Sequence, residues 1–228
     1  MSTCLRKKAR ENIFNIMFYE PVKRIIDIIG ATIGMVFFLP IAIITAFAIE
    51  IESPGPILAN TPKRVRQRGK EFRLLKFRSM IPNAHSLLHT DPKFKMLLEE
   101  YKKSSYKLYN DPRVTKVGKF IRRHSIDEIP QLINVLVGDM SLVGPRPYYP
   151  FELKEQQEKY PHTKNLVKEV LEVKPGITGQ WQVSGRSEIN FDKRIQMDAE
   201  YARKKSLVYD IIILLKSPLA MITGKGAI

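Results

Sequence analysis

Cysteine is almost absent from this sequence, and acidic residues are scarce beside basic ones. Cys4 is the one cysteine among 228 residues, which excludes an intrachain disulfide and a cysteine-based zinc site. Asp and Glu number 23 against 38 Lys and Arg, which gives a formal net charge of +15. An excess of this size indicates an anionic partner, which is nucleic acid, anionic lipid or a phosphorylated substrate.

Several common signatures are also missing. The sequence has no P-loop, no GxGxxG dinucleotide fingerprint and no GxSxG nucleophile motif. It has no internal repeat, and no Gly/Ser-rich or Pro-rich linker divides it. Apolar residues make up 44% and charged residues 27%, so the composition is that of a folded protein.

One long apolar segment is present. From Ile28 to Ile49 the chain runs 22 residues without a charge. A straight helix of that length reaches about 33 Å, roughly the thickness of a bilayer's hydrocarbon core. The segment is too long for the apolar part of a signal peptide and lacks a small-residue cleavage site before Glu50. We therefore predict that it enters a membrane, with a buried core helix as the alternative.

Basic residues flank the apolar segment on both sides, and the positive-inside rule places both flanks on the cytoplasmic face. Pro40 lies inside the segment, where it lacks an N–H and disturbs the helix. A re-entrant helix that bends at Pro40 and returns keeps both flanks on one side, whereas a single crossing translocates one of them. The sequence favours the re-entrant form. The flanking residues are Arg6, Lys7, Lys8, Arg10, Lys23 and Arg24 before the segment, and Lys63, Arg64, Arg66, Arg68 and Lys70 after it.

The expected fold class is α+β, mostly helical with a small β-hairpin or sheet. We expect residues 1–56 to hold the membrane helix and residues 57–228 to form a catalytic domain on the cytoplasmic face. Two short strands are predicted in 57–80 around the turn Gln67–Lys70, and Asp111-Pro112 marks another turn. The last helix is strongly apolar and is expected in the core, with the membrane interface as the alternative. Helices are predicted over 83–108, 125–137 ending at Gly138, 151–171, 190–204 and 207–222.

The candidate reaction centre is the Asp127-Glu128 pair, which follows Arg122 and Ser125. One interpretation is purely structural, because Ser125-x-x-Glu128 has the form of a helix capping box. The functional interpretation uses a helix N-terminus, whose N–H groups favour phosphate. There Asp127 is a candidate carboxylate nucleophile, and Glu128 a candidate Mg²⁺ ligand. Arg122 and Arg123 would help to neutralise a pyrophosphate.

Two loops rich in Gly and Pro add further candidates. Gly144-Pro145-Arg146-Pro147 places Arg146 between two prolines that fix the backbone. The loop Pro175–Gly179 is followed by Trp181 and by Gly185-Arg186, and glycines permit close approach of the backbone to a ligand. For each loop, an ordinary turn with a solvated Arg is the alternative.

The stretch Lys63–Arg78 contains eight basic residues and one acid. Most of these are interpreted as a solvated or lipid-facing surface that attracts anionic headgroups. Lys76 is the exception, with its side chain turned towards substrate phosphate. His85 and His89 are four residues apart, but Ser86 stands where a zincin has Glu, so the pair is interpreted as surface or packing.

Together these motifs closely resemble the bacterial polyprenyl-phosphate phosphoglycosyltransferases of the monotopic, initiating sugar-transferase type. The similarity runs from Pro21 to the end of the chain, and its order and spacing are specific. The motifs that carry it are Lys76–Met80, Ser125–Glu128 with Pro130–Leu132, Gly138–Pro147, and Pro175–Gly179 running on to Gly185-Arg186.

The resemblance implies a re-entrant helix in the bacterial inner membrane, a Mg²⁺ requirement and a covalent intermediate. Asp127 matches the family's nucleophile and Glu128 its acidic partner at the metal. Lys76 and Arg122 match residues that line the active site, Arg186 a phosphate contact, and Asp198 another acid near the site. The implied donor is a UDP-sugar and the acceptor is polyprenyl phosphate, with UMP released.

The segment between Met80 and Asp111 resembles the branch that starts exopolysaccharide, capsule or O-antigen chains, which often uses UDP-galactose or UDP-glucose. The chain departs from the family at Leu39, where Ser commonly precedes the membrane proline, and at Arg66, where Gly is usual. Many members carry further N-terminal membrane helices, so the chain is either a minimal enzyme or a fragment. A homodimer is a further expectation.

Three other functions are compatible with parts of the sequence. A membrane-tethered nucleic-acid binder fits the positive charge, but aromatic residues are not interleaved with the basic clusters as stacking requires. We therefore expect no nucleic-acid partner. A scaffold without catalysis is a second alternative, and the intact Asp127-Glu128 pair argues against it. A nucleotide-sugar phosphohydrolase, in which water replaces the lipid acceptor, is the third.

Overall fold

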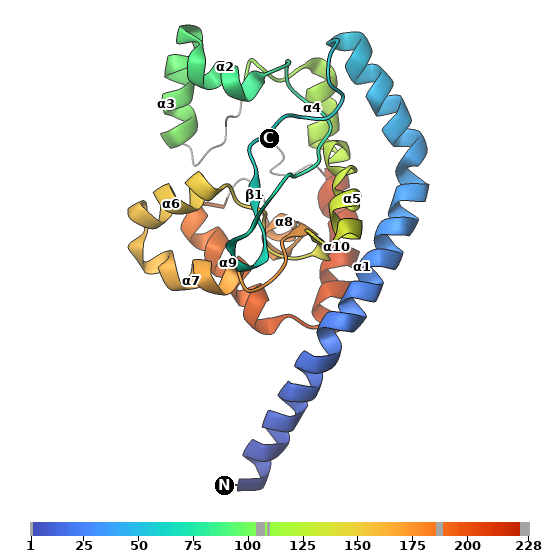
Figure 1. Ribbon diagram of the computed structural model, residues 1–228, viewed down its shortest axis with the longest axis vertical. Coiled ribbons are helices and arrows are strands. Elements are labelled where there is room, and N and C mark those ends of the chain that lie inside the picture. The colour runs from blue at the N-terminus through green and yellow to red at the C-terminus, as the bar shows by residue number, and fades with distance from the viewer. Residues whose placement is uncertain (1, 104–107, 109, 186–188, 224–228) are drawn as a thin grey trace.

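The computed structural model describes residues 2–103, 108, 110–185 and 189–223. It shows a mostly helical protein with two small sheets and one long N-terminal helix (Figure 1). The helices are α1 (Ser2–Glu52), α2 (Ala84–Thr90), α3 (Lys95–Lys103), α4 (Lys116–Arg123), α5 (Gln131–Val137), α6 (Pro150–Lys159), α7 (Lys164–Val170), α8 (Gln180–Ser184), α9 (Phe191–Lys204) and α10 (Leu207–Thr223). The strands are β1 (Arg64–Val65), β2 (Glu71–Phe72), β3 (Ser141–Val143) and β4 (Gly176–Thr178).

Helix α1 continues through Pro21 and Pro40 as one helix of 51 residues. Figure 1 shows it bending along its upper half without breaking. From Phe18 to Glu52 it is long and apolar enough to cross a membrane, by length and composition. Most of this span is exposed, with Val36 and Phe37 each 72% accessible, which is unlike the core helix of a soluble protein. A return of the chain at Pro40 stays a prediction, as does a domain boundary at residue 56.

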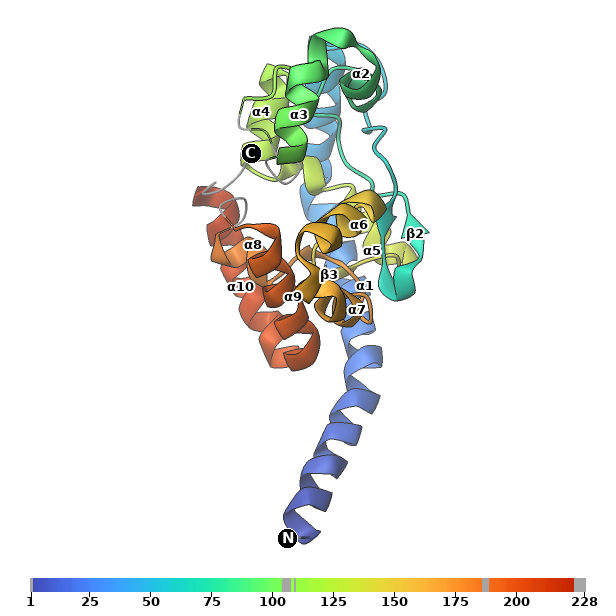
Figure 2. The same cartoon turned by 90° about the vertical axis from the view of Figure 1, so that its left-hand side faces the viewer.

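One narrow stripe of α1 packs on the rest of the chain. Tyr19, Asp27, Ala31, Thr45 and Ile49 are buried, and their spacing places them on one face of the helix. At the far end, the Glu52 carboxylate accepts hydrogen bonds from the first two N–H groups of α4, at 2.7 and 2.9 Å. The body therefore lies beside α1 along its whole apolar length. Figures 1 and 2 both place α2, α3 and α4 at this far end.

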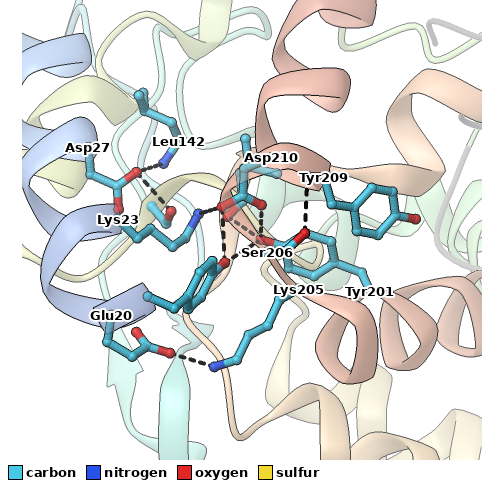
Figure 3. A network of polar contacts seen from close by, with 12 residues as sticks. Glu20, Lys23, Asp27, Leu142, Tyr201, Lys205, Ser206, Tyr209 and Asp210 are labelled. Atoms are coloured by element: carbon cyan, nitrogen blue, oxygen red, sulfur yellow. Dashed lines mark hydrogen bonds and ion pairs between the residues drawn. The ribbon is translucent and has the colours of Figure 1, made fainter. Parts of the chain in front are cut away.

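The near end of α1 is joined to α9 and α10 by a buried polar network (Figure 3). Asp210 on α10 accepts hydrogen bonds from Tyr19 at 3.0 Å, Lys23 at 2.6 Å and Tyr201 at 2.6 Å. Asp27 also ties α1 to β3, because it accepts from the Ser141 hydroxyl and the Leu142 N–H. These contacts fix the start of the apolar helix against the body.

The first sheet confirms the predicted strand pair. Strands β1 and β2 are antiparallel, with Arg64 opposite Phe72, and a 3₁₀ turn at Gln67–Gly69 joins them. The turn needs positive φ at Arg68 and Gly69, which glycine adopts without strain.

The second sheet differs from the sequence prediction, in which its two strands belong to separate loops rich in Gly and Pro. Strands β3 and β4 pair in parallel, with Ser141 opposite Gly176. A Cβ at Gly176 would lie 2.0 Å from the Gly144 N, so only glycine permits this approach. The pairing brings the loop of Arg146 beside the loop that leads to Trp181.

Two predicted helices are interrupted by proline. The segment 83–108 contains α2, a 3₁₀ turn from Pro92 and α3. The segment 151–171 contains α6, a 3₁₀ turn from Pro161 and α7. In both cases the residue before proline leaves the helical region, because the proline ring crowds it. The helices at 190–204 and 207–222 are confirmed as α9 and α10.

Helix α10 is both core and surface. Ile213 is 1% exposed and Asp210 6%, so one face packs inward as expected. The opposite face exposes apolar side chains, which are Val208, Ile211, Ile212, Leu215 and Leu219. The prediction of a core position therefore holds for one face only.

Candidate active site

Asp127 and Glu128 lie on a single 3₁₀ turn, Ile126–Glu128, between α4 and α5. The capping box predicted at Ser125 is wrong. Ser125 has a φ of 56° and its side chain makes no capping hydrogen bond. The regular helix begins only at Gln131, after Pro130. The two carboxylates therefore sit on a tight turn, with Asp127 buried and Glu128 about one third exposed.

Lys76 joins the two carboxylates. Its Nζ lies 3.2 Å from Asp127 Oδ2 and 2.8 Å from Glu128 Oε1. The backbone supports this contact, because Phe77 N donates to the Asp127 carbonyl at 2.9 Å. The strand-like segment after β2 is thus held against the 3₁₀ turn, and Lys76 faces the reaction centre as expected.

Burial raises the pKa of the Asp127 carboxyl above its ordinary value, and the Glu128 charge adds to this, while Lys76 and Arg122 oppose it. Burial favours the neutral amine of Lys76, but the charges of Asp127 and Glu128 hold the pKa of Lys76 above its ordinary value. The cluster is therefore a triad in which Lys76 contacts both carboxylates. Arg122, on the last turn of α4, is close enough to stabilise the Asp127 carboxylate.

Arg146 and Asp198 meet in a second cluster. Asp198 on α9 is fully buried, and its Oδ2 accepts from the Tyr148 hydroxyl at 2.7 Å and from the Arg146 N–H at 3.3 Å. Burial raises the pKa of Asp198 to about 7, and the hydrogen bonds and nearby guanidinium groups only partly offset that rise. Asp198 thus holds the Arg146 loop by its backbone.

Two further members of this cluster, Arg194 and Glu152, are not predicted from the sequence. Arg194 is 1% exposed, and its Nη2 donates to Glu152 Oε1 at 2.8 Å. Its guanidinium carbon lies 5.7 Å from the centre of the Trp181 ring, and that of Arg146 lies 5.2 Å away. In the sequence, Arg194 resembles a surface residue of an amphipathic helix. One sequence feature indicates that it belongs to the site: it lies four residues before Asp198, and this spacing places both residues on the same face of α9.

Pro40, the predicted membrane bend, is an exposed residue of α1 and joins neither cluster. The predicted phosphate contact Arg186 lies outside the described residues. The histidines His85 and His89 pack their rings edge to face, with centres 4.9 Å apart, as expected for a packing pair.

The reaction centre offers carboxylate oxygens, which are the kind of ligand that a divalent cation such as Mg²⁺ binds. Among the described residues, no group of three or more His, Cys, Asp or Glu side chains could hold a metal. Mg²⁺, however, commonly uses one or two carboxylates and takes its other oxygens from water and phosphate. Asp127 and Glu128 supply two such carboxylates, of which Glu128 is the more accessible.

The long apolar helix is that of a membrane-associated protein, and in both clusters Lys and Arg side chains lie beside carboxylates. The chain belongs to the bacterial sugar transferase family, whose model matches residues 18–224. The undecaprenyl-phosphate galactose phosphotransferase of Salmonella typhimurium is 40% identical over 210 residues, which are 90% of this chain and 41% of that protein.

Two further relatives extend the comparison. The UDP-glucose:undecaprenyl-phosphate glucose-1-phosphate transferase of Escherichia coli is 36% identical over 214 residues, covering 90% of this chain and 41% of that protein. The exopolysaccharide production protein ExoY of Rhizobium meliloti is 33% identical over 205 residues, covering 90% of this chain and 87% of ExoY. The chain spans about two fifths of the length of the first relatives.

Proposed function

We propose that this chain transfers a sugar-1-phosphate, a hexose-1-phosphate, from a UDP-sugar to polyprenyl phosphate and releases UMP. The observation that carries the proposal is the contact of Lys76 with both Asp127 and Glu128, beside a long apolar helix. The relatives from Salmonella and Escherichia coli are named for undecaprenyl-phosphate sugar-phosphate transfer, which supports the same chemistry here. The product would start a surface polysaccharide.

The reaction proceeds in two displacements. In the first, a carboxylate oxygen of Asp127 bonds to the β-phosphorus of the UDP-sugar, and the bond from that phosphorus to the bridging oxygen breaks, so UMP leaves with the electron pair. In the second, an oxygen of polyprenyl phosphate bonds to the same phosphorus and Asp127 departs. Because burial raises the pKa of Asp127, its carboxylate is more basic than an exposed one and therefore a better nucleophile.

Cations around the 3₁₀ turn Ile126–Glu128 stabilise the negative charge that develops on the transferred phosphosugar. The Lys76 ammonium orients Asp127 and remains protonated, since the two carboxylates raise its pKa. Arg122 adds positive charge on the α4 side. Such fixed charges stabilise a transferring phosphoryl group without rearrangement during the reaction. Asp127 and Glu128 would hold Mg²⁺, which neutralises phosphate oxygens as a Lewis acid when bound.

The lipid acceptor requires the site to lie at a membrane surface. We propose that α1 enters the cytoplasmic membrane from the inside and that both of its ends stay on that side. Support comes from the body, which contacts α1 at Lys23 and again at Glu52, on either side of the apolar run. If α1 crossed the bilayer perpendicularly, the body that packs along it would also have to lie inside the bilayer. The exposed apolar face of α10 adds to the surface available to lipid.

The test of the transferase proposal is UMP release from a panel of UDP-sugars with Mg²⁺, with and without undecaprenyl phosphate. We expect release that requires the lipid and occurs with one or two hexose donors. Release without the lipid would identify a phosphohydrolase instead. No release from any nucleotide-sugar would favour the scaffold.

The orientation of α1 is tested with single cysteines on its two flanks. In a Cys4→Ser background, Lys8→Cys and Lys70→Cys are labelled with a membrane-impermeant maleimide. We expect both to react in inverted vesicles and neither in intact spheroplasts, because both flanks face the cytoplasm. A permeant maleimide, which should label both in both preparations, is the control. Labelling of one position from outside would establish a single crossing.

A further inference from the structure

Arg64 is a buried cation that belongs to neither of the two clusters. From sequence it belongs to the lipid-facing basic stretch, but the structure buries it on β1, where it is 7% exposed. Its guanidinium carbon lies 3.2 Å from the centre of the Tyr149 ring, and its Nη1 donates to the Pro147 carbonyl at 3.2 Å. The neighbouring Val65 N–H donates to the Tyr148 carbonyl at 2.9 Å. The guanidinium is therefore held rigidly beside the Arg146 loop.

The charge of Arg64 is not balanced by the protein. Among the described residues, no carboxylate lies within 4.0 Å of its guanidinium. The Nε of Arg64 is buried without a hydrogen-bond partner. Among the described residues, the one acceptor for the guanidinium group is the Pro147 carbonyl, which accepts from Nη1. A buried cation left in this state is costly unless a ligand supplies the opposite charge.

Arg64 contacts the segment that follows Arg146, and its charge also acts on Lys76. Its positive charge opposes protonation of Lys76 at the reaction centre, where the carboxylates nevertheless keep the pKa of Lys76 raised. Burial and Arg194 lower the pKa of Arg146, and Arg64 lowers it further. A cation whose charge acts on both clusters is suited to an anion that contacts both of them. The Nε of Arg146 is likewise buried without a partner.

We propose that Arg64 binds the donor, and that its guanidinium, with that of Arg146, takes the phosphate that leaves with the nucleoside. This inference rests on the proposed function, which places the neighbouring phosphate at Asp127. The nucleoside-linked phosphate then lies next along the pyrophosphate, towards the second cluster. Two guanidinium groups suit it, because Arg donates paired hydrogen bonds to phosphate oxygens.

The test compares the affinities of UMP and uridine for the full chain in detergent with Mg²⁺, by calorimetry. We expect Arg64→Gln to lose at least about tenfold in UMP affinity, as charge-assisted hydrogen bonds to phosphate are lost. Uridine affinity should change less than about twofold, because uridine has no phosphate to contact. Arg64→Lys keeps the charge without the planar fork and should fall between Arg64→Gln and the wild type.

Arg66→Gln is the matched control. Arg66 is two residues away, one third exposed and 3.5 Å from Asp139, so its replacement should leave both affinities unchanged. Equal losses of UMP and uridine in Arg64→Gln would assign Arg64 to structure only and overturn the proposal. So would an unchanged UMP affinity, or a wild type that does not prefer UMP over uridine. Lipid-dependent UMP release by the wild type, measured separately, shows whether the proposed function itself stands.

Discussion

Asp127→Asn is expected to lower the rate of lipid-dependent UMP release at least about 10³-fold, because the amide cannot act as the attacking group. The fold should persist. Asp127 is buried and its pKa is raised by that burial, so a neutral side chain of the same shape is well tolerated there. Lys76 keeps its 2.8 Å contact with Glu128. The thermal unfolding temperature should therefore stay close to that of the wild type.

A covalent adduct separates the nucleophile from a merely structural acid. Wild-type protein incubated with the donor and no lipid should gain the mass of one phosphosugar, and the Asp127→Asn variant should not. Asp139→Asn is the control, because Asp139 is a partly exposed acid paired with Arg66. An adduct of equal yield in the Asp127→Asn protein would show that another group attacks the phosphorus.

Asp210→Ala is expected to cost about 3–5 kcal/mol in the free energy of unfolding, as is typical when one partner of a buried ion pair is removed. The Lys23 and Asp210 side chains are only 12% and 8% exposed, and two tyrosine hydroxyls donate to the same carboxylate. Without Asp210, a buried ammonium loses its counter-charge and α1 loses one of its attachments to α9 and α10 (Figure 3). A fall of roughly 10 °C in the thermal unfolding temperature is expected.

Glu200→Ala is the matched control on the preceding helix. Glu200 pairs with Lys204 at 2.6 Å, but both side chains are largely exposed. Exposed pairs of this i, i+4 kind contribute only about 0.3–0.5 kcal/mol. Both variants are compared by thermal unfolding in the same detergent. If Asp210→Ala melts together with Glu200→Ala, the network does not hold α1 to the body.

Local signals in the sequence were accurate where neighbouring residues decide the structure. The Gln67–Gly69 turn between two short strands, the end of α5 at Gly138 and the last two helices all formed as predicted. Gly138 adopts a φ of 90°, which glycine accepts readily. The prolines at 92 and 161 were equally visible, yet the helices were predicted to run through them.

The structure brings together the residues that the sequence proposes as a reaction centre, but their local geometry differs from the prediction. Lys76, Asp127 and Glu128 meet as expected. The sequence predicts that Asp127 and Glu128 lie at a helix N-terminus, but they lie on a 3₁₀ turn. A regular helix that runs from Ser125 through Pro130 is disfavoured, because proline lacks the N–H and its ring clashes with the preceding turn. A pattern such as Ser-x-x-Glu shows that a capping box is possible. Whether the capping box forms depends on the conformation of the surrounding backbone.

The sequence by itself determined the long apolar helix, the excess of positive charge, the acidic pair and the family, since each depends on composition or on residues close together in the chain. Only the tertiary structure decided the parallel pairing of β3 with β4 and which cations are buried. Arg64, Arg78 and Arg194 look like surface residues in the sequence, but each is enclosed by segments distant in the chain. Burial depends on such long-range packing, and residue type and local spacing carry little information about it.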